Sequence, residues 1–299
     1  MSLPSAMRVT PFPPGRRGVL LPADDHAAAS AGICMYTASK PWVIRGQQLA
    51  ELLVRRIGMS VLPGKRAVWK APCVDDDWNE LNRGWEQAIG SFDGVSLYLR
   101  RQHDRSGLTM VLTDAGIPRG IVKLRDDKVG LEREQRALHA VAAAQPTAFR
   151  APRPFGTGST ESGWHWSAQE AVFTRPHRPV LRADDGLFAQ VSDVLTGLYD
   201  VTADSRPAHN DLTPWNLRAD HHGITWLIDW EDCGEAPLGS DRTYFFVSAF
   251  ALAGTAVPTD LPAAAVEHWS ALITSRPTRG GADSTLRRRQ LQALVLSGV

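Results

Sequence analysis

The chain has 299 residues, 43% of them hydrophobic and 22% charged, which is enough to bury one or two sizeable cores. Its formal net charge is +1 and its lysines and arginines are scattered, so the composition provides no basic field for nucleic acid. The three cysteines are odd in number and far apart, which argues against a disulfide framework. Most of the ten tryptophans lie in apolar runs, which favours core packing. We therefore expect a globular protein with no nucleic-acid partner.

The N-terminal segment and the longest apolar segment both favour a cytoplasmic location. Prolines lie within residues 1–18, where the apolar core of a signal peptide would be. The longest apolar stretch, residues 244–257, spans about fourteen residues, fewer than the roughly twenty that a bilayer requires. We expect no membrane insertion and interpret this stretch as a buried helix.

Residues 1–90 carry a helical pattern of their own. An amphipathic helix closed by Gly58 is predicted from the spacing of Gln47, Gln48, Leu49, Leu52, Leu53 and Ile57. A second helix is expected from about residue 76, because the acidic triplet Asp75–Asp77 favours a helix N-terminus. We predict that the leucine face packs on the lobe that follows and braces it. A part in an acceptor site or a docking surface is the alternative.

The next segment has the pattern of strands followed by a helix. Residues 95–100 and 108–113 are candidate strands joined by the loop 101–107, and a third strand covers residues 120–124. Lys123 lies near the end of that third strand. One apolar face of a helix is then predicted from Leu131, Leu138 and Val141. Further on, residues 163–173 alternate like a strand and pass into a segment rich in proline and arginine.

The most informative segment runs from Ala208 to Asp241. His209, Asp211 and Asn216 lie in one loop that Pro214 stiffens, and Asp229 ends the apolar, β-branched run 224–228, which is typical of a buried strand. Phosphoryl transfer requires a carboxylate to orient the attacking hydroxyl, and oxygen ligands for Mg²⁺. Asp211 suits the first task, and Asn216 and Asp229 suit the second.

This segment resembles the aminoglycoside phosphotransferase and choline kinase family, relatives of the protein kinases. The family's HxDxxxxN motif corresponds to residues 209–216, and its metal-binding IDW corresponds to residues 228–230. Asp241 falls where the family has a buried carboxylate that braces the catalytic loop. The resemblance covers roughly residues 91–260.

The resemblance implies an α+β, two-lobed protein kinase-like fold, with a small antiparallel β lobe and a mainly helical lobe. The expected domains are a helical N-terminal extension at 1–90 that packs on the small lobe, an N-lobe at 91–172 with a hinge near 169–172, and a C-lobe at 173–299 with the catalytic loop at 209–216. The expected cofactors are ATP or GTP and Mg²⁺. The expected catalytic residues are Asp211 and His209, and the expected metal ligands are Asn216 and Asp229.

A nucleotide site is implied as well. In the family a strand lysine pairs with a helix glutamate, so Lys123 is expected to pair with Glu134, with Glu132 as the alternative. The glycine motif GxGxxG is missing from the loop 101–107, but backbone N–H groups and a guanidinium there can still contact phosphate. The remaining expected nucleotide-binding residues are Arg105, Ser106 and Gly107 in that loop, and Glu170, Ala171 and Val172 at the hinge.

The predicted reaction is transfer of the γ-phosphate to a hydroxyl of a small molecule, such as a sugar, an aminoglycoside-like compound or a cell-envelope precursor. Only 39 positions separate Glu170 from His209, and the helix expected between them carries little negative charge, so a bulky polycationic acceptor is disfavoured. A catalytically silent kinase-like protein that binds nucleotide or a partner is the alternative. A protein-directed kinase is disfavoured by HND in place of HRD and by DWE in place of DFG.

Overall fold

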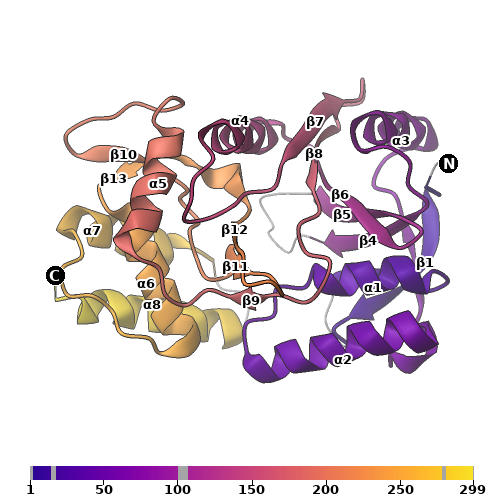
Figure 1. The fold of residues 1–299 in the computed structure, drawn as a ribbon, viewed down its shortest axis with the longest axis horizontal. Helices are drawn as coiled ribbons and strands as arrows, with labels where there is room; N and C mark the ends of the chain where they lie inside the picture. Colours follow the sequence, from indigo (N-terminus) through magenta and orange to yellow (C-terminus); the bar gives the residue numbers. More distant parts are fainter. Residues whose placement is uncertain (1–2, 15–17, 100–106, 278–280, 299) are drawn as a thin grey trace. The chain divides into compact units, whose positions relative to one another are not determined.

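The computed structural model describes residues 3–14, 18–99, 107–277 and 281–298 (Figure 1). The chain forms two compact units. Unit 1 consists of Met1–Gln135 and Pro152–Arg178, and unit 2 consists of Arg136–Ala151 and Pro179–Val299. The division falls within α4 (Val129–Ala144), so this helix belongs partly to each unit.

Unit 1 is built on an eight-stranded sheet with the order β3-β1-β2-β4-β5-β6-β8-β7. Each of these neighbouring strands pairs antiparallel with the next. In chain order the strands are β1 (Ala6–Phe12), β2 (Val19–Pro22), β3 (Ala67–Lys70), β4 (Gly94–Leu99), β5 (Gly107–Asp114), β6 (Ile117–Arg125), β7 (Pro154–Ser159) and β8 (His165–Glu170). Its helical elements are α1 (His26–Cys34), α2 (Pro41–Ile57), the 3₁₀ turn η1 (Met59–Val61) and α3 (Asp75–Ile89).

Residues 1–90 differ from the helical extension that the sequence predicts. They supply β1, β2 and β3, which lie in the same sheet as the strands expected for the N-lobe. Proline within β1 and at the end of β2 conceals these strands from a pattern search. The two predicted helices are present as α2, which ends at Gly58, and α3, whose first turn contains Asp75, Asp76 and Asp77. The domain boundaries predicted near residues 90 and 172 stay predictions.

The predicted burial of the leucine face of α2 was wrong. Leu49, Leu52 and Ile57 are exposed, whereas Gln47, Glu51 and Val54 are buried. The leucine face therefore does not brace the sheet. That task belongs to α3, whose Trp78, Leu81 and Trp85 are buried in one hydrophobic cluster with side chains of the sheet.

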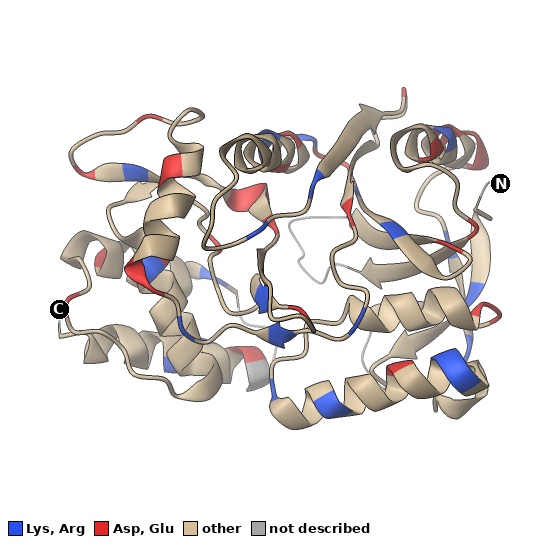
Figure 2. Ribbon diagram, in the orientation of Figure 1, with Lys and Arg blue, Asp and Glu red and all other residues tan. Residues whose placement is uncertain are grey.

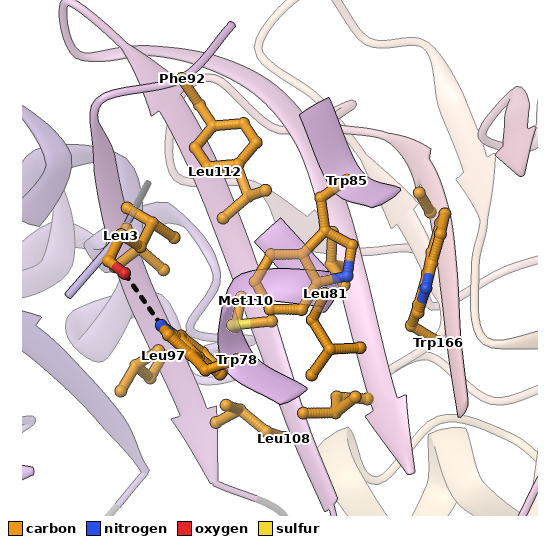
Figure 3. Close-up of a cluster of buried hydrophobic side chains, with 14 of the residues drawn as sticks. Leu3, Trp78, Leu81, Trp85, Phe92, Leu97, Leu108, Met110, Leu112 and Trp166 are labelled. Atoms are coloured by element: carbon orange, nitrogen blue, oxygen red, sulfur yellow. Dashed lines mark hydrogen bonds between the residues drawn. The ribbon is translucent and has the colours of Figure 1, made fainter. Parts of the chain in front are cut away.

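Figure 3 shows this cluster, in which α3 lies over strands of the sheet. Trp78 and Trp85 meet edge to face with ring centroids 5.2 Å apart, and the indole N–H of Trp78 donates to the carbonyl oxygen of Leu3 at 2.9 Å. Leu97, Leu112 and other strand residues complete the cluster. Residues on both sides of position 90 thus share one core.

Unit 2 is mainly helical, with short strands. The helices are α5 (Asp185–Leu195), α6 (Ser240–Ala253), α7 (Ala263–Ser275) and α8 (Gly281–Leu296), with the 3₁₀ turn η2 (Trp230–Asp232). The strands are β9 (Arg178–Pro179), β10 (Ser205–Ala208), β11 (Leu217–Ala219), β12 (Thr225–Leu227) and β13 (Gly234–Pro237). Helix α6 accounts for most of the apolar stretch 244–257, and Tyr244, Phe245 and Val247 are buried as expected.

The α+β class predicted from the sequence is confirmed, since an antiparallel sheet dominates unit 1 and helices dominate unit 2. Within the described residues, no helix is both long enough and apolar enough to span a bilayer.

The tryptophan core of unit 1 generates a stability prediction. Trp78→Ala removes a side chain that is 1% exposed together with its hydrogen bond to Leu3, so it should lower the free energy of unfolding by about 3–5 kcal/mol. Trp42→Ala is the matched control, because Trp42 is 71% exposed and its loss should cost less than about 0.5 kcal/mol. Urea unfolding of both variants measures the difference. Equal losses would contradict the assignment of the core.

Candidate active site

Two antiparallel strand pairs fix the predicted catalytic loop in unit 2. The loop 209–216 leaves β10 and enters β11, while the segment 228–233 leaves β12 and enters β13. Strand β10 pairs with β13, and β11 pairs with β12, so each end of the loop is tied to an end of the second segment. Beyond the β11–β12 ladder the N–H of Ile228 donates to the carbonyl oxygen of Asn216 at 3.0 Å. Asn216 and Asp229 are thereby held at the same end of one hairpin.

Asp241 fixes the start of the loop from α6. Its buried carboxylate accepts the backbone N–H of His209 at 2.7 Å and that of Asn210 at 3.0 Å. Burial raises the pKa of Asp241 to about 6, and the two hydrogen bonds oppose this rise. The predicted buried carboxylate that braces the loop is confirmed.

His209 is fully buried, and both of its ring nitrogens contact the backbone. Nδ1 accepts the N–H of Asp211 at 3.2 Å, and Nε2 lies 3.2 Å from the carbonyl oxygen of Ile228. Because Nδ1 accepts, Nε2 carries the proton and donates it, which is the neutral form of the ring. The ring also packs on Trp230 with centroids 4.6 Å apart. His209 therefore connects the two segments through its ring, and its predicted catalytic role stays a prediction.

Asp211 and Asn216 are in direct contact. The side-chain amide of Asn216 donates to Oδ2 of Asp211 at 2.8 Å and to its carbonyl oxygen at 2.9 Å. Burial raises the pKa of Asp211 to about 8, and the carboxylates of Asp229 and Asp232 add to the rise. The guanidinium of Arg276 and the hydrogen bond from Asn216 act in the opposite direction. The carboxyl groups of Asp211, Asp229 and Asp232 therefore lie near one another in a partly buried site.

Asp229 adopts a left-handed backbone conformation, with φ 67° and ψ 62°. This conformation is uncommon outside glycine, although Asn and Asp adopt it more readily than other residues. It occurs where β12 gives way to η2, and Asn210 in the facing loop has φ 60°. Both sharp turns fall where the two segments bring their polar side chains together.

The donor chemistry of these residues fits a hard divalent cation. The amide nitrogen of Asn216 is directed to Asp211, so its amide oxygen remains as an acceptor, and Asp229 provides carboxylate oxygens. Oxygen ligands of this kind suit Mg²⁺. The mutual repulsion of Asp211, Asp229 and Asp232, expressed in the raised pKa of Asp211, is what such a cation relieves.

A cavity of about 260 Å³ opens beside Asp211 within unit 2. The aromatic and basic residues of its wall include Trp215, Tyr244 and Arg276. Arg276 donates to the hydroxyl of Tyr244 at 2.5 Å, and the Tyr244 ring stacks on Trp269 with centroids 3.7 Å apart. The arginine is thus held in place against the cavity.

The sequence reasoning missed two charged residues that act on Asp211. Asp232 lies three positions after Asp229, so its place in the short turn η2 is a local signal that was available. Arg276 lies far along the chain, after α7, and no spacing rule connects it with the motif.

Arg218, just after the loop 209–216, is fully buried. Its guanidinium donates to the carbonyl oxygen of Pro214 at 3.3 Å, and burial lowers its pKa to about 9.

In unit 1, β6 and α4 bring Lys123 and Glu134 together. Nζ of Lys123 lies 2.7 Å from Oε1 of Glu134, and both side chains are buried. Glu132, the alternative partner, instead pairs with Lys128 on the surface at 3.2 Å. A buried lysine held by a carboxylate is charged and fixed in direction, as a phosphate contact requires.

The other residues expected to bind the nucleotide form fewer contacts that indicate such a role. Arg105 and Ser106 lie outside the described residues, and Gly107 begins β5 with φ 149°. Glu170 ends β8, and its carboxylate accepts the N–H of Arg153 at 3.2 Å. Ala171 and Val172 follow without regular secondary structure. The proposed nucleotide contacts of all these residues stay predictions.

No protein-family model matches the chain, and neither does any curated protein. The solved structures that it resembles include aminoglycoside phosphotransferases and other small-molecule kinases. An amicoumacin kinase in complex with AMP-PNP and Ca²⁺ is 12% identical, with a TM-score of 0.43, over 76% of this chain and 87% of that one.

Two aminoglycoside phosphotransferases give similar values. An aminoglycoside-3'-phosphotransferase of type VIII is 17% identical with a TM-score of 0.40, covering 74% of this chain and 98% of that one. The GDP complex of aminoglycoside 2'-phosphotransferase-IIIa is 12% identical with a TM-score of 0.40, covering 73% and 97%. Sequence identities and TM-scores this low do not establish an activity. The activity of this chain is therefore inferred from its site residues.

The brace formed by Asp241 generates a prediction. Asp241→Ala leaves the N–H groups of His209 and Asn210 buried without their acceptor, which should destabilise the protein by roughly 1–3 kcal/mol for each group. Asp204→Asn, at an exposed residue just before β10, is the control and should change little. Chemical unfolding measures both. A loss no larger than that of the control would mean that Asp241 does not hold the loop.

Proposed function

We propose that this chain is a phosphotransferase that moves the γ-phosphate of ATP or GTP to a hydroxyl group of a small molecule. The observation that carries the proposal is the meeting of Asp211, Asn216 and Asp229 at the ends of two paired strands in unit 2, with Asp211 and Asn216 in contact at 2.8 Å. A general base and two oxygen ligands for a cation are the groups that phosphoryl transfer requires.

Asp211 is the proposed general base. Its raised pKa makes its carboxylate a stronger base than an ordinary aspartate, since proton transfer is favoured when the pKa of the base approaches the working pH. The amide of Asn216 fixes the direction of this carboxylate. His209 and Asp241 hold the backbone from which it projects.

Asn216 and Asp229 are the residues that we assign to Mg²⁺. When bound, the cation would offset the negative charge of the nucleotide phosphates. Within unit 1, Lys123 is assigned to phosphate binding, with Glu134 keeping its ammonium group in place. Glu170, Ala171 and Val172 are assigned to the nucleotide base, and Gly107 with its neighbours to the phosphates.

The cavity beside Asp211 supports a small acceptor. Its volume of about 260 Å³ is slightly smaller than that of most ligand pockets, and its wall contains aromatic rings and the cation of Arg276. These features favour a compact hydroxyl compound, such as a sugar or a cell-envelope precursor, over a large polycation. The proposal also places the protein in the cytoplasm, where the nucleotide is available.

The test is phosphate transfer from radiolabelled ATP or GTP, with Mg²⁺, to pools of hydroxyl compounds, together with nucleotide binding by calorimetry. Turnover with any small hydroxyl compound supports the proposal. Binding of MgATP without transfer to any pool would favour a catalytically silent protein, and transfer to protein substrates alone would favour a protein kinase.

The assignment of Asp211 as the general base predicts that its substitution lowers the rate of phosphate transfer without weakening nucleotide binding. Asp211→Asn should reduce kcat by about 10²–10⁴ and leave the Kd for MgATP within a fewfold, because the base acts on the acceptor hydroxyl. Asp193→Asn, at an exposed residue of α5, is the control. Turnover of Asp211→Asn close to that of the control would place the base elsewhere.

The metal assignment predicts loss of Mg²⁺-dependent nucleotide binding. Asp229→Asn removes one full charge from the cation's ligands while keeping a residue that tolerates the left-handed backbone, so it should weaken MgATP binding at least about tenfold. Asn216→Ala removes a neutral ligand and should weaken it less. Calorimetric titration with ATP, with and without Mg²⁺, measures both effects. Unchanged Mg²⁺ dependence in both variants would remove the metal site from the proposal.

A further inference from the structure

Helix α2 in unit 1 buries two polar side chains, Gln47 and Glu51, together with Val54, and leaves several large apolar side chains exposed. Trp42, Leu49 and Ile57 are 71%, 57% and 63% exposed, and Leu52 is exposed as well. In a soluble protein an amphipathic helix ordinarily buries its apolar stripe. A contiguous row of large exposed apolar side chains therefore marks a surface that binds something.

Hydrogen bonds fix this orientation. The amide nitrogen of Gln47 donates to the carbonyl oxygens of Ile33 and Tyr36, at 2.7 and 2.8 Å, and so satisfies carbonyl groups at and just beyond the end of α1. One carboxylate oxygen of Glu51 accepts the hydroxyl of Ser30 at 3.0 Å. Rotating α2 to bury its leucines would break all three bonds. The outward direction of the apolar face is therefore built into the packing of α2 on α1, which lie side by side in Figure 1.

The exposed face also carries positive charge. Arg45 and Arg56 are exposed and fall on the same side of the helix as Trp42 and Leu49, because all four are spaced by three, four or seven residues. Residues 36–70 contain seven lysines and arginines but a single acidic residue, Glu51, which is buried and lies 3.3 Å from Arg55. The whole chain has a net charge of +1, so this local excess of positive charge is a property of the segment. Figure 2 shows the basic positions along α2.

We propose that α2 is a membrane-surface helix, which lies in the plane of an anionic lipid surface with Trp42, Leu49, Leu52 and Ile57 in the headgroup region. Helices that bind in this way have a basic polar flank and a face of tryptophan and leucine. The arginines extend their apolar stems along the surface and place their guanidinium groups at lipid phosphates. Nucleic acid would not use the apolar side chains, and a purely apolar protein groove would not use the arginines. This binding crosses no bilayer, and it does not depend on the proposed phosphotransferase activity.

The experiment is cosedimentation of the full-length protein with vesicles of phosphatidylcholine alone, or of phosphatidylcholine mixed with phosphatidylglycerol. The wild type should bind the anionic vesicles and release them as salt is raised, with little binding to phosphatidylcholine alone. Leu49→Gln with Ile57→Gln should weaken binding at least about tenfold. Arg45→Gln with Arg56→Gln should weaken it about fivefold for each arginine removed.

A matched control comes from α8, where Arg288 and Val295 are also exposed. Arg288→Gln with Val295→Gln should bind anionic vesicles like the wild type. All variants change exposed residues, and circular dichroism with thermal unfolding establishes that they fold. Failure of the wild type to bind anionic vesicles overturns the proposal without any variant, as does equal binding by the α2 and α8 variants. A wild-type dimer that Leu49→Gln with Ile57→Gln dissociates, with no vesicle binding, would assign the face to a second copy of the chain.

Discussion

The site in unit 2 depends on one constraint, the two hydrogen bonds that the backbone N–H groups of His209 and Asn210 donate to the carboxylate of Asp241. They fix the start of the loop 209–216, while the β11–β12 hairpin fixes its end through Asn216. Between these points His209 joins the loop to Ile228 and Trp230 in the second segment. The position of Asp211 therefore follows from backbone contacts, and little is left to side-chain freedom.

This arrangement also explains why burying several carboxyl groups in one place is tolerable. Asp241 has two N–H donors, and Asp211 has the amide of Asn216 and the nearby charge of Arg276. Each acid thus has a compensating group, although burial still raises the pKa of both. Buried carboxyl groups with raised pKa values that gather beside a cavity are typical of functional sites.

The meeting of Asp211, Asn216 and Asp229 could be predicted from the sequence, because the motif of the resembled family fixes both the residue types and their local spacing. The pairing of Lys123 with Glu134 was expected from the resemblance, in which a strand lysine pairs with a glutamate of the next helix, and the two side chains are in contact. Arg276 could not be predicted, because only the fold brings the end of α7 to Asp211. Strands β1 and β2 were missed because each contains proline, and because the pairing of β1 with β3 and of β2 with β4 depends on residues further along the chain. The orientation of α2 was predicted wrongly, since periodicity locates an apolar face but cannot say whether that face is covered.

At Asp229, the left-handed backbone conformation and the proposed cation site favour different residues. With φ 67°, folding alone would favour glycine there, because glycine has no Cβ to strain. Asparagine would serve folding nearly as well. A carboxylate at this position also adds repulsion toward Asp211. The backbone conformation and this repulsion both favour other residues at position 229, whereas the proposed cation site requires a carboxylate there. Selection for a more heat-resistant protein, carried out without selection for the proposed activity, would therefore show which of these demands keeps the carboxylate in place.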